Sequence, residues 1–301
     1  MRGLKSPFYS LSTGLMVSLA TLAAKAQPAP TRPTISDGER AAASWAVQNV
    51  VSQHDYLHAV GRNVEEIELD WVSPTGPFAA TAAFSSPDWA LYGMDGIVKN
   101  YGRVTHQESL DALHKLAQID PNVKDVPENY GAGSSLFLHT NTTPIIQIAG
   151  DGKTAQGLWY TPGLDLNPII QDGKVHLRAT LSYQKMGADF VKENGQWKIW
   201  HLLVAFDLSP PVSPEMIAPA AGKMGDLVTT EPPKPSARPP DRGTPIPEMQ
   251  KPLYVYPRYS PERTAKLWPQ LPKPYYTFSE TFSNCNCKQQ IPGVLLSSPK
   301  Q

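Results

Sequence analysis

The sequence has few cysteines, no long apolar run and no surplus of basic residues, and each absence excludes a class of protein. The two cysteines, Cys285 and Cys287, are too few for a structural zinc site and too close for an ordinary loop-closing disulfide. A strained local disulfide and an intermolecular one both stay open. No apolar stretch after residue 26 reaches the ~20 residues that span a bilayer. A zinc-stabilised domain and a membrane-spanning segment in the mature protein are therefore not expected.

Charge and motif content exclude two further classes. The chain has 27 basic and 27 acidic residues, and the first 26 residues contain Arg2, Lys5 and Lys25 but no acid, which leaves 24 basic against 27 acidic. A nucleic-acid binder normally has a basic surplus on one face, so no nucleic-acid partner is expected. The sequence also lacks a glycine-rich nucleotide motif, a Gly-x-Ser-x-Gly elbow and a reactive cysteine context. We therefore expect no organic cofactor.

The first 26 residues have the three parts of a secretory signal peptide. Arg2 and Lys5 supply the positive start, residues 11–23 form a short apolar stretch, and Ala24-Lys25-Ala26 has the small-x-small pattern of a cleavage site. An uncleaved anchor is the weaker alternative. We predict export to the periplasm or the extracellular space, with a mature chain that begins near Gln27.

The distribution of proline divides the remaining chain. Residues 27–35 are predicted to be a disordered leader. Nineteen of the 31 prolines lie in the 94 residues after Asp207, which excludes long helices and central strands there. Residues 36–207 are therefore predicted to form one domain, and residues 208–301 a proline-rich tail. Part of the tail, about 251–282, is expected to pack on the domain through the apolar residues Leu253, Tyr254, Tyr256, Trp268, Tyr275, Tyr276 and Phe278.

The domain begins with a predicted amphipathic helix. Ser36-Asp37 can cap it, Glu39 lies in its first turn, and the pattern extends to Gly61. At ~100° per residue, one stripe consists of Ala43, Ala46, Val47, Val50, Val51 and Leu57. His54 lies in the middle of this stripe and His58 at its edge. Two shorter helices are predicted at about 95–101 and 106–118.

Strand patterns dominate the second half of the domain. They cover residues 135–149, 154–160, 175–192 and 197–207, with turn sequences at 150–152 and 193–195. Helices followed by antiparallel strands predict an α+β fold, in which N-terminal helices cover one face of a curved antiparallel sheet. The last strand, which starts at Trp197, is apolar on both faces. Its outer face must therefore be covered by a second subunit of a homodimer or by the tail.

Three stretches resemble the SnoaL-like branch of the nuclear-transport-factor-2-like superfamily. They are residues 54–62, which end in Ala-Val-Gly-Arg where relatives often have Asp-x-Gly-Asp, residues 139–163 (HTNTTPIIQIAGDGKTAQGLWYTPG) and residues 189–201 (DFVKENGQWKIWH). The resemblance covers 36–207 and implies a cone of curved sheet, closed by helices, with a pocket inside. It implies functions that range from dehydratases, isomerases, polyketide cyclases and cofactor-free lyases of lignin-derived diarylpropanes to proteins without catalysis. The carboxylate that many catalytic relatives carry near the end of the first helix corresponds to Ala59 here, so an Asp base at that position is not expected.

The two histidines of the first helix are the leading catalytic candidates. Burying an imidazole without a partner costs a few kcal/mol, so His54 needs either a hydrogen bond or a function. It is predicted to be a general base or acid, or else a core histidine bonded to a backbone carbonyl. His58 follows four residues later on nearly the same face. Such a pair can also ligate a metal, but no third ligand is evident from the spacing, and we expect no metal.

Further candidates lie on the predicted strands. His139 is predicted to be catalytic, and Asn141, on the same face, to bind substrate. In the next long strand Tyr183, Lys185 and Asp189 share a face. There Lys185 is predicted to balance a developing negative charge, such as that of a phenolate, and Tyr183 to contact substrate. A surface salt bridge between Lys185 and Asp189 is the alternative.

The remaining substrate-binding candidates are Trp89, Tyr92 and His201, although a structural role suits His201 as well. An apolar cavity with a few imidazoles, one ammonium group and no phosphate-binding loop suits a small uncharged or phenolic ligand. The leading hypothesis is a cofactor-free lyase that removes formaldehyde or water from a small aromatic compound outside the cytoplasm. The alternatives are a non-catalytic small-molecule-binding protein and a dimerisation module of the same fold.

Overall fold

The computed structural model describes residues 32–213, 215–217, 226–234, 250–252, 258–262 and 267–285. Several predictions concern residues outside these ranges: the signal peptide, residues 27–31 of the leader, the tail anchors Leu253, Tyr254 and Tyr256, and Cys287. No helix in the described part of the chain is long and apolar enough to cross a membrane.

The helical elements precede most of the sheet. The helices are α1 (Asp37–His58), α2 (Asn63–Asp70), α3 (Met94–Gly96) and α4 (Thr105–Ile119), with a π-helix η2 (Ile97–Val104) between the last two and 3₁₀ turns η1 (Ala79–Thr81), η3 (Pro127–Asn129) and η4 (Phe278–Glu280). Ser36 and Glu39 form a capping box at the start of α1. At the other end α1 stops at His58, short of the predicted Gly61, because Gly61 has a φ of 72° and cannot continue a right-handed helix.

The buried face of α1 matches the predicted stripe and adds Asp55 to it. Its buried residues are Ala43, Val47, Val51, His54 and Asp55. Trp45 and Tyr56 project from the opposite face and are mostly exposed. Helix α2 was not predicted, since it is only one residue longer than two turns and four of its eight residues are acidic.

The strands form one sheet in the order β2-β1-β7-β6-β5-β3, in which β4 also pairs with β5 and β8 with β6. The strands are β1 (Ala83–Ser85), β2 (Ala90–Tyr92), β3 (Leu136–His139), β4 (Thr142–Ile148), β5 (Thr154–Gln171), β6 (Lys174–Glu193), β7 (Gln196–Leu208) and β8 (Val228–Thr229). All pairs are antiparallel except β1 with β7 and β6 with β8.

Strand β5 is much longer than the predicted 154–160. Pro162 and Gly163 read as strand breakers, but Gly163 is paired with both β3 and β6, so the strand continues. The hairpin to β6 turns at Asp172 and Gly173, which both have positive φ, as a two-residue turn between twisted strands requires.

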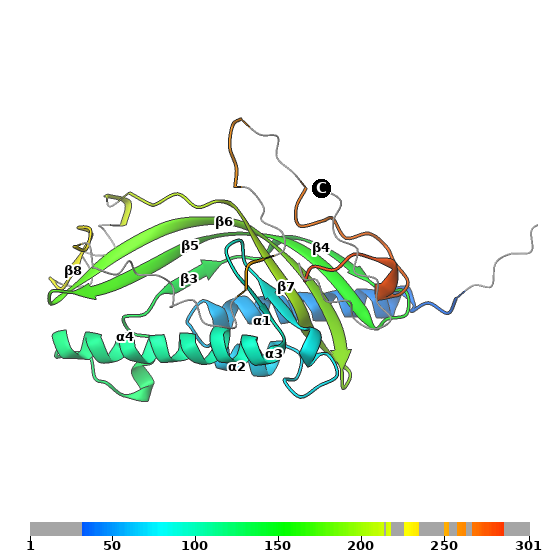
Figure 1. Ribbon diagram of the computed structural model, residues 1–301, viewed down its shortest axis with the longest axis horizontal. Coiled ribbons are helices and arrows are strands. Elements are labelled where there is room, and N and C mark those ends of the chain that lie inside the picture. The colour runs from blue at the N-terminus through cyan, green and yellow to red at the C-terminus, as the bar shows by residue number, and fades with distance from the viewer. Residues whose placement is uncertain are drawn as a thin grey trace, which may run out of the picture. The chain divides into compact units, whose positions relative to one another are not determined.

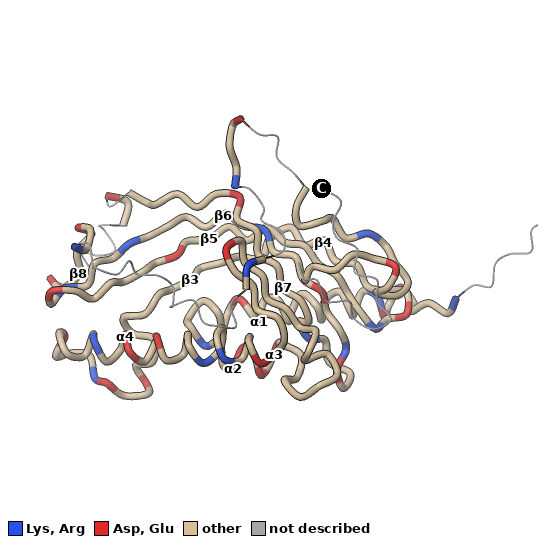
Figure 2. Tube along the Cα trace, in the orientation of Figure 1, with Lys and Arg blue, Asp and Glu red and all other residues tan. Residues whose placement is uncertain are grey.

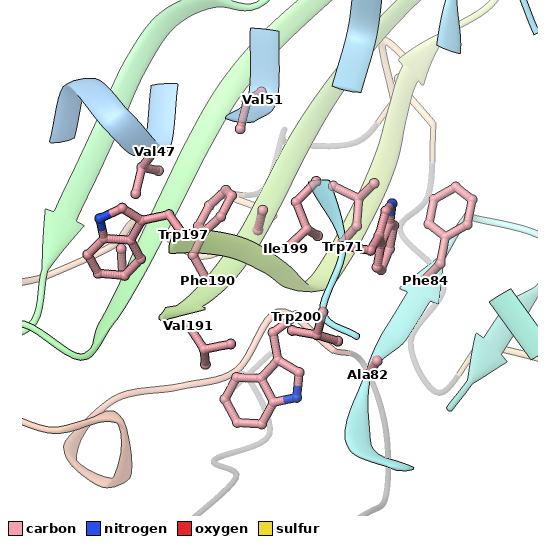
Figure 3. Packing of buried hydrophobic residues seen from close by; sticks show 14 of the residues in the cluster. Val47, Val51, Trp71, Ala82, Phe84, Phe190, Val191, Trp197, Ile199 and Trp200 are labelled. Atoms are coloured by element: carbon pink, nitrogen blue, oxygen red, sulfur yellow. The ribbon is translucent and has the colours of Figure 1, made fainter. Parts of the chain in front are cut away.

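The helices lie under one face of the curved sheet, and the predicted α+β architecture is confirmed (Figure 1). Val47 and Val51 of α1 belong to the main core with residues of β6 and β7, and Trp71 and Phe84 are members of the same cluster (Figure 3). Lysine and arginine are interspersed with aspartate and glutamate along the described part of the trace (Figure 2).

Described tail residues cover the other face of the sheet. Trp268 is buried in a cluster with Leu203 and Ala205 of β7. A Cβ atom on Gly187 of β6 would collide with Asn284, so the tail approaches the sheet backbone closely. The outer face of β7, predicted to need a second subunit or the tail, therefore packs against residue 268 of the tail.

Asp189 on β6 anchors this part of the tail. The side chain is fully buried, and Oδ1 accepts hydrogen bonds from Gln156 Nε2 (2.9 Å) and Asn284 Nδ2 (3.0 Å). Its Oδ2 is contacted by the Asn284 backbone N–H (2.7 Å), Ser283 Oγ (3.0 Å) and His201 Nδ1 (2.8 Å). Next to these residues Cys285 is buried and disulfide-bonded. A buried carboxylate with this many donors ties the tail to the sheet.

Candidate functional site

A cavity of about 360 Å³ lies between the helices and the sheet. Its imidazoles come from His54 and His58 of α1 and His139 of β3, so the structure brings together all three predicted catalytic histidines. Aromatic side chains form much of the remaining wall: Phe84, Trp89, Tyr101, Phe137 and Phe206. This combination of apolar walls with a few polar groups is typical of a small-molecule site.

Glu66 is the buried carboxylate behind this wall. Its side chain is fully buried on α2, where Oε1 accepts a hydrogen bond from Trp71 Nε1 at 3.0 Å. Oε2 accepts hydrogen bonds from Tyr101 Oη at 2.9 Å and Asn63 Nδ2 at 3.2 Å. The prediction from sequence missed this residue because it missed α2. The available signal was a carboxylate next to Ile67 on the face of the helix that is buried.

His54 forms a close ion pair with Glu66. Its Nδ1 lies 2.6 Å from Glu66 Oε1, at an angle outside that of a hydrogen bond. Burial by itself would lower the pKa of His54, but the carboxylate of Glu66, together with those of Asp55 and Asp70, raises it to about 9. His54 is therefore an imidazolium at neutral pH. The sequence around His54 does not reveal this shift, because Glu66 lies on another helix.

His58 is joined to the same carboxylate through Tyr101. Its Nδ1 lies 2.8 Å from Tyr101 Oη, which donates to Glu66 Oε2. Burial and then Glu66 raise the pKa of Tyr101 well above its ordinary value, so the phenol keeps its proton. Asn63 Nδ2 also lies 3.1 Å from His58 Nδ1. Tyr101 and Asn63 therefore hold this edge of the His58 ring, and both also contact Glu66.

His139 is held by two protein groups. Its Nε2 lies 3.1 Å from Asp165 Oδ1, and Gln184 Nε2 lies 3.0 Å from the same Nε2 and 3.1 Å from Nδ1. The His139 ring centroid is 5.9 Å from that of His58. His139 therefore shares the cavity with the other histidines, in an orientation fixed by Asp165 and Gln184.

Two further buried carboxyl groups have raised pKa values. Burial raises the pKa of Asp55, on the cavity wall, to about 6, against the opposing effect of the His54 charge. Burial likewise raises the pKa of Asp70 to about 7. Neither carboxylate oxygen of Asp70 has a hydrogen-bond partner, although its side chain is almost fully buried. Asp70 therefore costs stability whenever it is ionised.

Asp70→Asn is expected to stabilise the protein at alkaline pH. The folded pKa of about 7 lies above the ordinary 3.8, so the penalty is absent below pH 3.8, grows as the pH rises and is complete above pH 7. The free energy of unfolding should exceed that of the wild type by roughly 2–4 kcal/mol at pH 8 and by much less near pH 4. Urea unfolding at both pH values measures this, with the exposed Glu68→Gln as control. A gain independent of pH would contradict the argument.

Lys185 does not reach the cavity, which corrects its predicted role. On β6 the cavity is lined by Gln184 and Met186, so Lys185 points to the other face. There its Nζ forms an ion pair with Asp207 Oδ1 at 3.0 Å. The alternative prediction of a pair with Asp189 was also wrong, since that carboxylate binds the tail.

The predicted substrate-binding residues do not all line the cavity. Trp89 lines the cavity, whereas Asn141 donates from Nδ2 to Val51 O at 3.2 Å and lies outside the lining. Tyr183 is about half exposed on the same face as Lys185, and Tyr92 is not part of the cavity wall.

His201 is fully buried on the face opposite the cavity. Its Nδ1 lies 2.8 Å from Asp189 Oδ2, and its Nε2 lies 3.0 Å from Thr81 O. This is the structural role that the sequence allowed as the alternative. With both ring nitrogens engaged by the protein, His201 does not contact a ligand in the cavity.

Within the described residues, no three His, Cys, Asp or Glu side chains are arranged to hold a metal ion. The i, i+4 pair of His54 and His58 is engaged by Glu66 and Tyr101, as described above.

No protein-family model and no curated protein matches the sequence. Among solved structures, the hexachlorocyclohexane dehydrochlorinase LinA-type3 from Novosphingobium barchaimii LL02 is similar at 16% identity, over 59% of this chain and 95% of that chain, with a TM-score of 0.38. A putative scytalone dehydratase from Novosphingobium aromaticivorans is similar at 13% identity over 59% and 93% of the two chains, with a TM-score of 0.41.

A putative dehydratase of the NTF2-like family from Streptomyces avermitilis is similar at 14% identity, over 57% of this chain and 98% of that chain, with a TM-score of 0.40. At identities of 13–16% and TM-scores below 0.5, these similarities carry no argument about the superfamily or the activity of this chain.

Proposed function

We propose that this protein is a lyase that removes water or formaldehyde from a small aromatic or phenolic compound without a cofactor. The observation that supports this proposal is that one buried carboxylate, Glu66, contacts His54 directly and reaches His58 through Tyr101. One imidazole is thereby charged and the other is held in place by Tyr101, and both line the same cavity. Elimination needs such a pair, one group to take a proton and one to supply it.

In the proposed reaction His58 is the general base and His54 the general acid. The imidazole of His58 takes a proton from the substrate. The His54 imidazolium balances the negative charge that develops on the leaving oxygen, which is the role predicted for Lys185. For loss of water, His58 takes the proton from a carbon atom, and the electron pair of the broken C–H bond forms the C=C bond. The departing hydroxide takes a proton from His54.

Loss of formaldehyde uses the same two groups on a 1,3-diol. His58 takes the proton of the terminal hydroxyl, and the C–C bond breaks to release formaldehyde. The electron pair of that bond forms C=C, and the second hydroxyl leaves with a proton from His54 as water. After either reaction His58 holds an added proton and His54 has lost one. Exchange with solvent restores both imidazoles before the next turnover.

The direct test is a screen of purified protein against hydroxylated aromatic compounds that include aryl-substituted 1,3-diols. Mass spectrometry should detect a product that has lost one water, or one water and one formaldehyde, in protein that has been treated with a chelator. A complete absence of product across the panel would contradict the proposal. Activity that a chelator abolishes and zinc restores would contradict its cofactor-free form.

His54→Gln is expected to lower turnover by about 10²–10⁴-fold, the usual contribution of positioned proton transfer. The wild-type rate should also fall as the pH rises through about 9, where His54 loses its charge. Turnover and melting temperature should be measured on the same sample. His114→Gln, a mostly exposed histidine on α4, is the control and should leave both unchanged.

A His54→Gln variant with a lower melting temperature but full activity per folded molecule would contradict the acid role. His58→Gln separates the remaining possibilities, since a general base is needed whatever carries the positive charge. Loss of turnover in His58→Gln alone would assign catalysis to His58 without His54.

A non-catalytic binding protein is the second candidate, and His139 supports it. Both ring nitrogens of His139 contact protein groups, as in a wall that orients a ligand without exchanging protons. Saturable binding of a compound that the protein leaves unchanged would favour this candidate.

We further propose, from the N-terminal 26 residues, that the reaction takes place outside the cytoplasm. Expression of the full-length chain in a Gram-negative host, followed by fractionation, should place the protein outside the cytoplasm with a first residue near Gln27. A full-length chain that stays in the cytoplasm would contradict this.

A further inference from the structure

The charge of the cavity wall disfavours charged ligands of either sign. Carboxyl groups of Asp55, Glu108 and Asp165 line it, whereas no Lys or Arg among the described residues does. A carboxylate or phosphate on a ligand would meet these acids in an enclosed, weakly screened space. A cationic ligand would meet the positive charge of His54 on the same wall. The remaining ligands are uncharged.

Two polar side chains at the wall lack partners within the protein. Asn100 on η2 is 4% exposed, and neither its Oδ1 nor its Nδ2 has a hydrogen-bond partner. Thr161 on β5 is 2% exposed, and its Oγ1 likewise has none. Both residues line the cavity, one from the helical layer and one from the sheet. Buried polar atoms are nearly always paired, so an unpaired amide beside a cavity calls for an explanation.

The π-helix supplies a reason for the position of Asn100. A π-helical turn is wider than an α-helical one and commonly occurs at functional sites. It also carries Tyr101, the residue that connects His58 to Glu66. Asn100 thus lies one residue away from the proposed catalytic network.

We infer that the cavity selects an uncharged aromatic compound bearing a hydroxyl group, and that Asn100 is the residue that recognises this hydroxyl. A hydroxyl can donate to Oδ1 and accept from Nδ2, so it satisfies both atoms of one amide. This inference rests on the same cavity as the proposed function and names the ligand class and a specificity residue for it.

The test is equilibrium binding of three probes of nearly equal shape: 2-naphthol, naphthalene and 2-naphthoate. None of them carries a leaving group that the proposed elimination could remove. Isothermal titration calorimetry of the full-length mature protein at neutral pH should give an affinity for 2-naphthol about tenfold above that for naphthalene, since two hydrogen bonds of ordinary strength supply such a factor. Binding of 2-naphthoate should be the weakest of the three.

Asn100→Leu is expected to remove the preference for 2-naphthol over naphthalene and to raise the melting temperature of the unliganded protein. The stability gain follows because leucine has a similar volume and no unpaired polar atoms. The control is Asn167→Leu, also on the cavity wall, because Asn167 Oδ1 already accepts a hydrogen bond from Ser135 Oγ at 3.2 Å. That variant should keep the preference for 2-naphthol.

The inference is overturned if wild-type protein binds 2-naphthoate as tightly as 2-naphthol, or binds naphthalene equally well. It is also overturned if Asn100→Leu keeps the preference. The wild-type comparison decides the matter even if that variant does not fold. Because binding is measured without turnover, these outcomes are independent of whether the protein is a lyase.

Discussion

Glu66→Gln is expected to lower the pKa of His54 from about 9 to below its ordinary 6.5. The carboxylate of Glu66 is the largest of the effects that raise this pKa, and burial, which lowers it, remains in the variant. His54 would then be neutral at pH 7, and turnover should fall by about 10²–10⁴-fold through loss of the charged acid. An NMR titration of the His54 ring protons measures the pKa directly, whether or not a substrate is known.

The same substitution should destabilise the fold by about 3–5 kcal/mol near neutral pH, because it removes one member of a buried ion pair. The folded pKa of His54 lies above the unfolded one, so this pair contributes stability that is complete below pH 6.5 and is lost as the pH rises through about 9. The free energy of unfolding of the wild type should decline between pH 6.5 and about 9. That of Glu66→Gln should decline less over the same interval.

Glu65→Gln is the matched control for Glu66→Gln. Glu65 is the neighbouring residue of α2, and its pair with Arg62 at 2.7 Å is about half exposed on both sides. Its loss should change stability by no more than ~1 kcal/mol. A His54 pKa that is unchanged in Glu66→Gln would show that the raised value has another origin, and the proposed division of acid and base would fail.

Asp189→Asn is expected to release the described end of the tail, residues 267–285, from the sheet. Both oxygens of Asp189 accept hydrogen bonds, Oδ1 from Gln156 and Asn284 and Oδ2 from Ser283 and the Asn284 backbone. An asparagine presents one NH₂ group, and in either amide orientation that group faces donors. The variant should therefore lose about 3–5 kcal/mol of stability, the usual cost of breaking a buried charged network.

Limited proteolysis combined with thermal unfolding measures this release. In Asp189→Asn, cleavage within 267–285 should become faster than in the wild type under conditions in which the rest of the domain stays intact. The control is Asp172→Asn in the β5–β6 hairpin, where the pair with Lys234 is exposed and a positive φ suits asparagine. Equal cleavage rates in the wild type and Asp189→Asn would contradict an anchoring role for Asp189.

Local sequence patterns were sufficient for most elements of the fold. The capping box at Ser36 and the apolar stripe predict α1, and the turns at 150–152 and 193–195 separate neighbouring antiparallel strands. These signals are local, because capping and turn chemistry depend on residues a few positions apart. Helix α2 has no such cap and little apolar surface, so its formation depends on packing against α1 and η2.

The histidines illustrate what the sequence by itself determined. Period and spacing alone place His54 and His58 on the buried side of one helix, because that side is defined by the apolar residues around them. Whether His54 is charged could not be read in the same way. Its pKa depends on Glu66, which lies twelve residues away and approaches only when α2 folds back on α1.

Only the tertiary structure decided which face of β6 meets the cavity. Alternation establishes that Lys185 and Asp189 share a face and that Gln184 and Met186 share the other. It does not identify the inner face, since a strand buried on both sides has no polar side to mark the outside. The helices pack over Gln184 and Met186 and the tail over Asp189, so the ammonium group of Lys185 lies outside the cavity and the imidazolium of His54 supplies the positive charge within it.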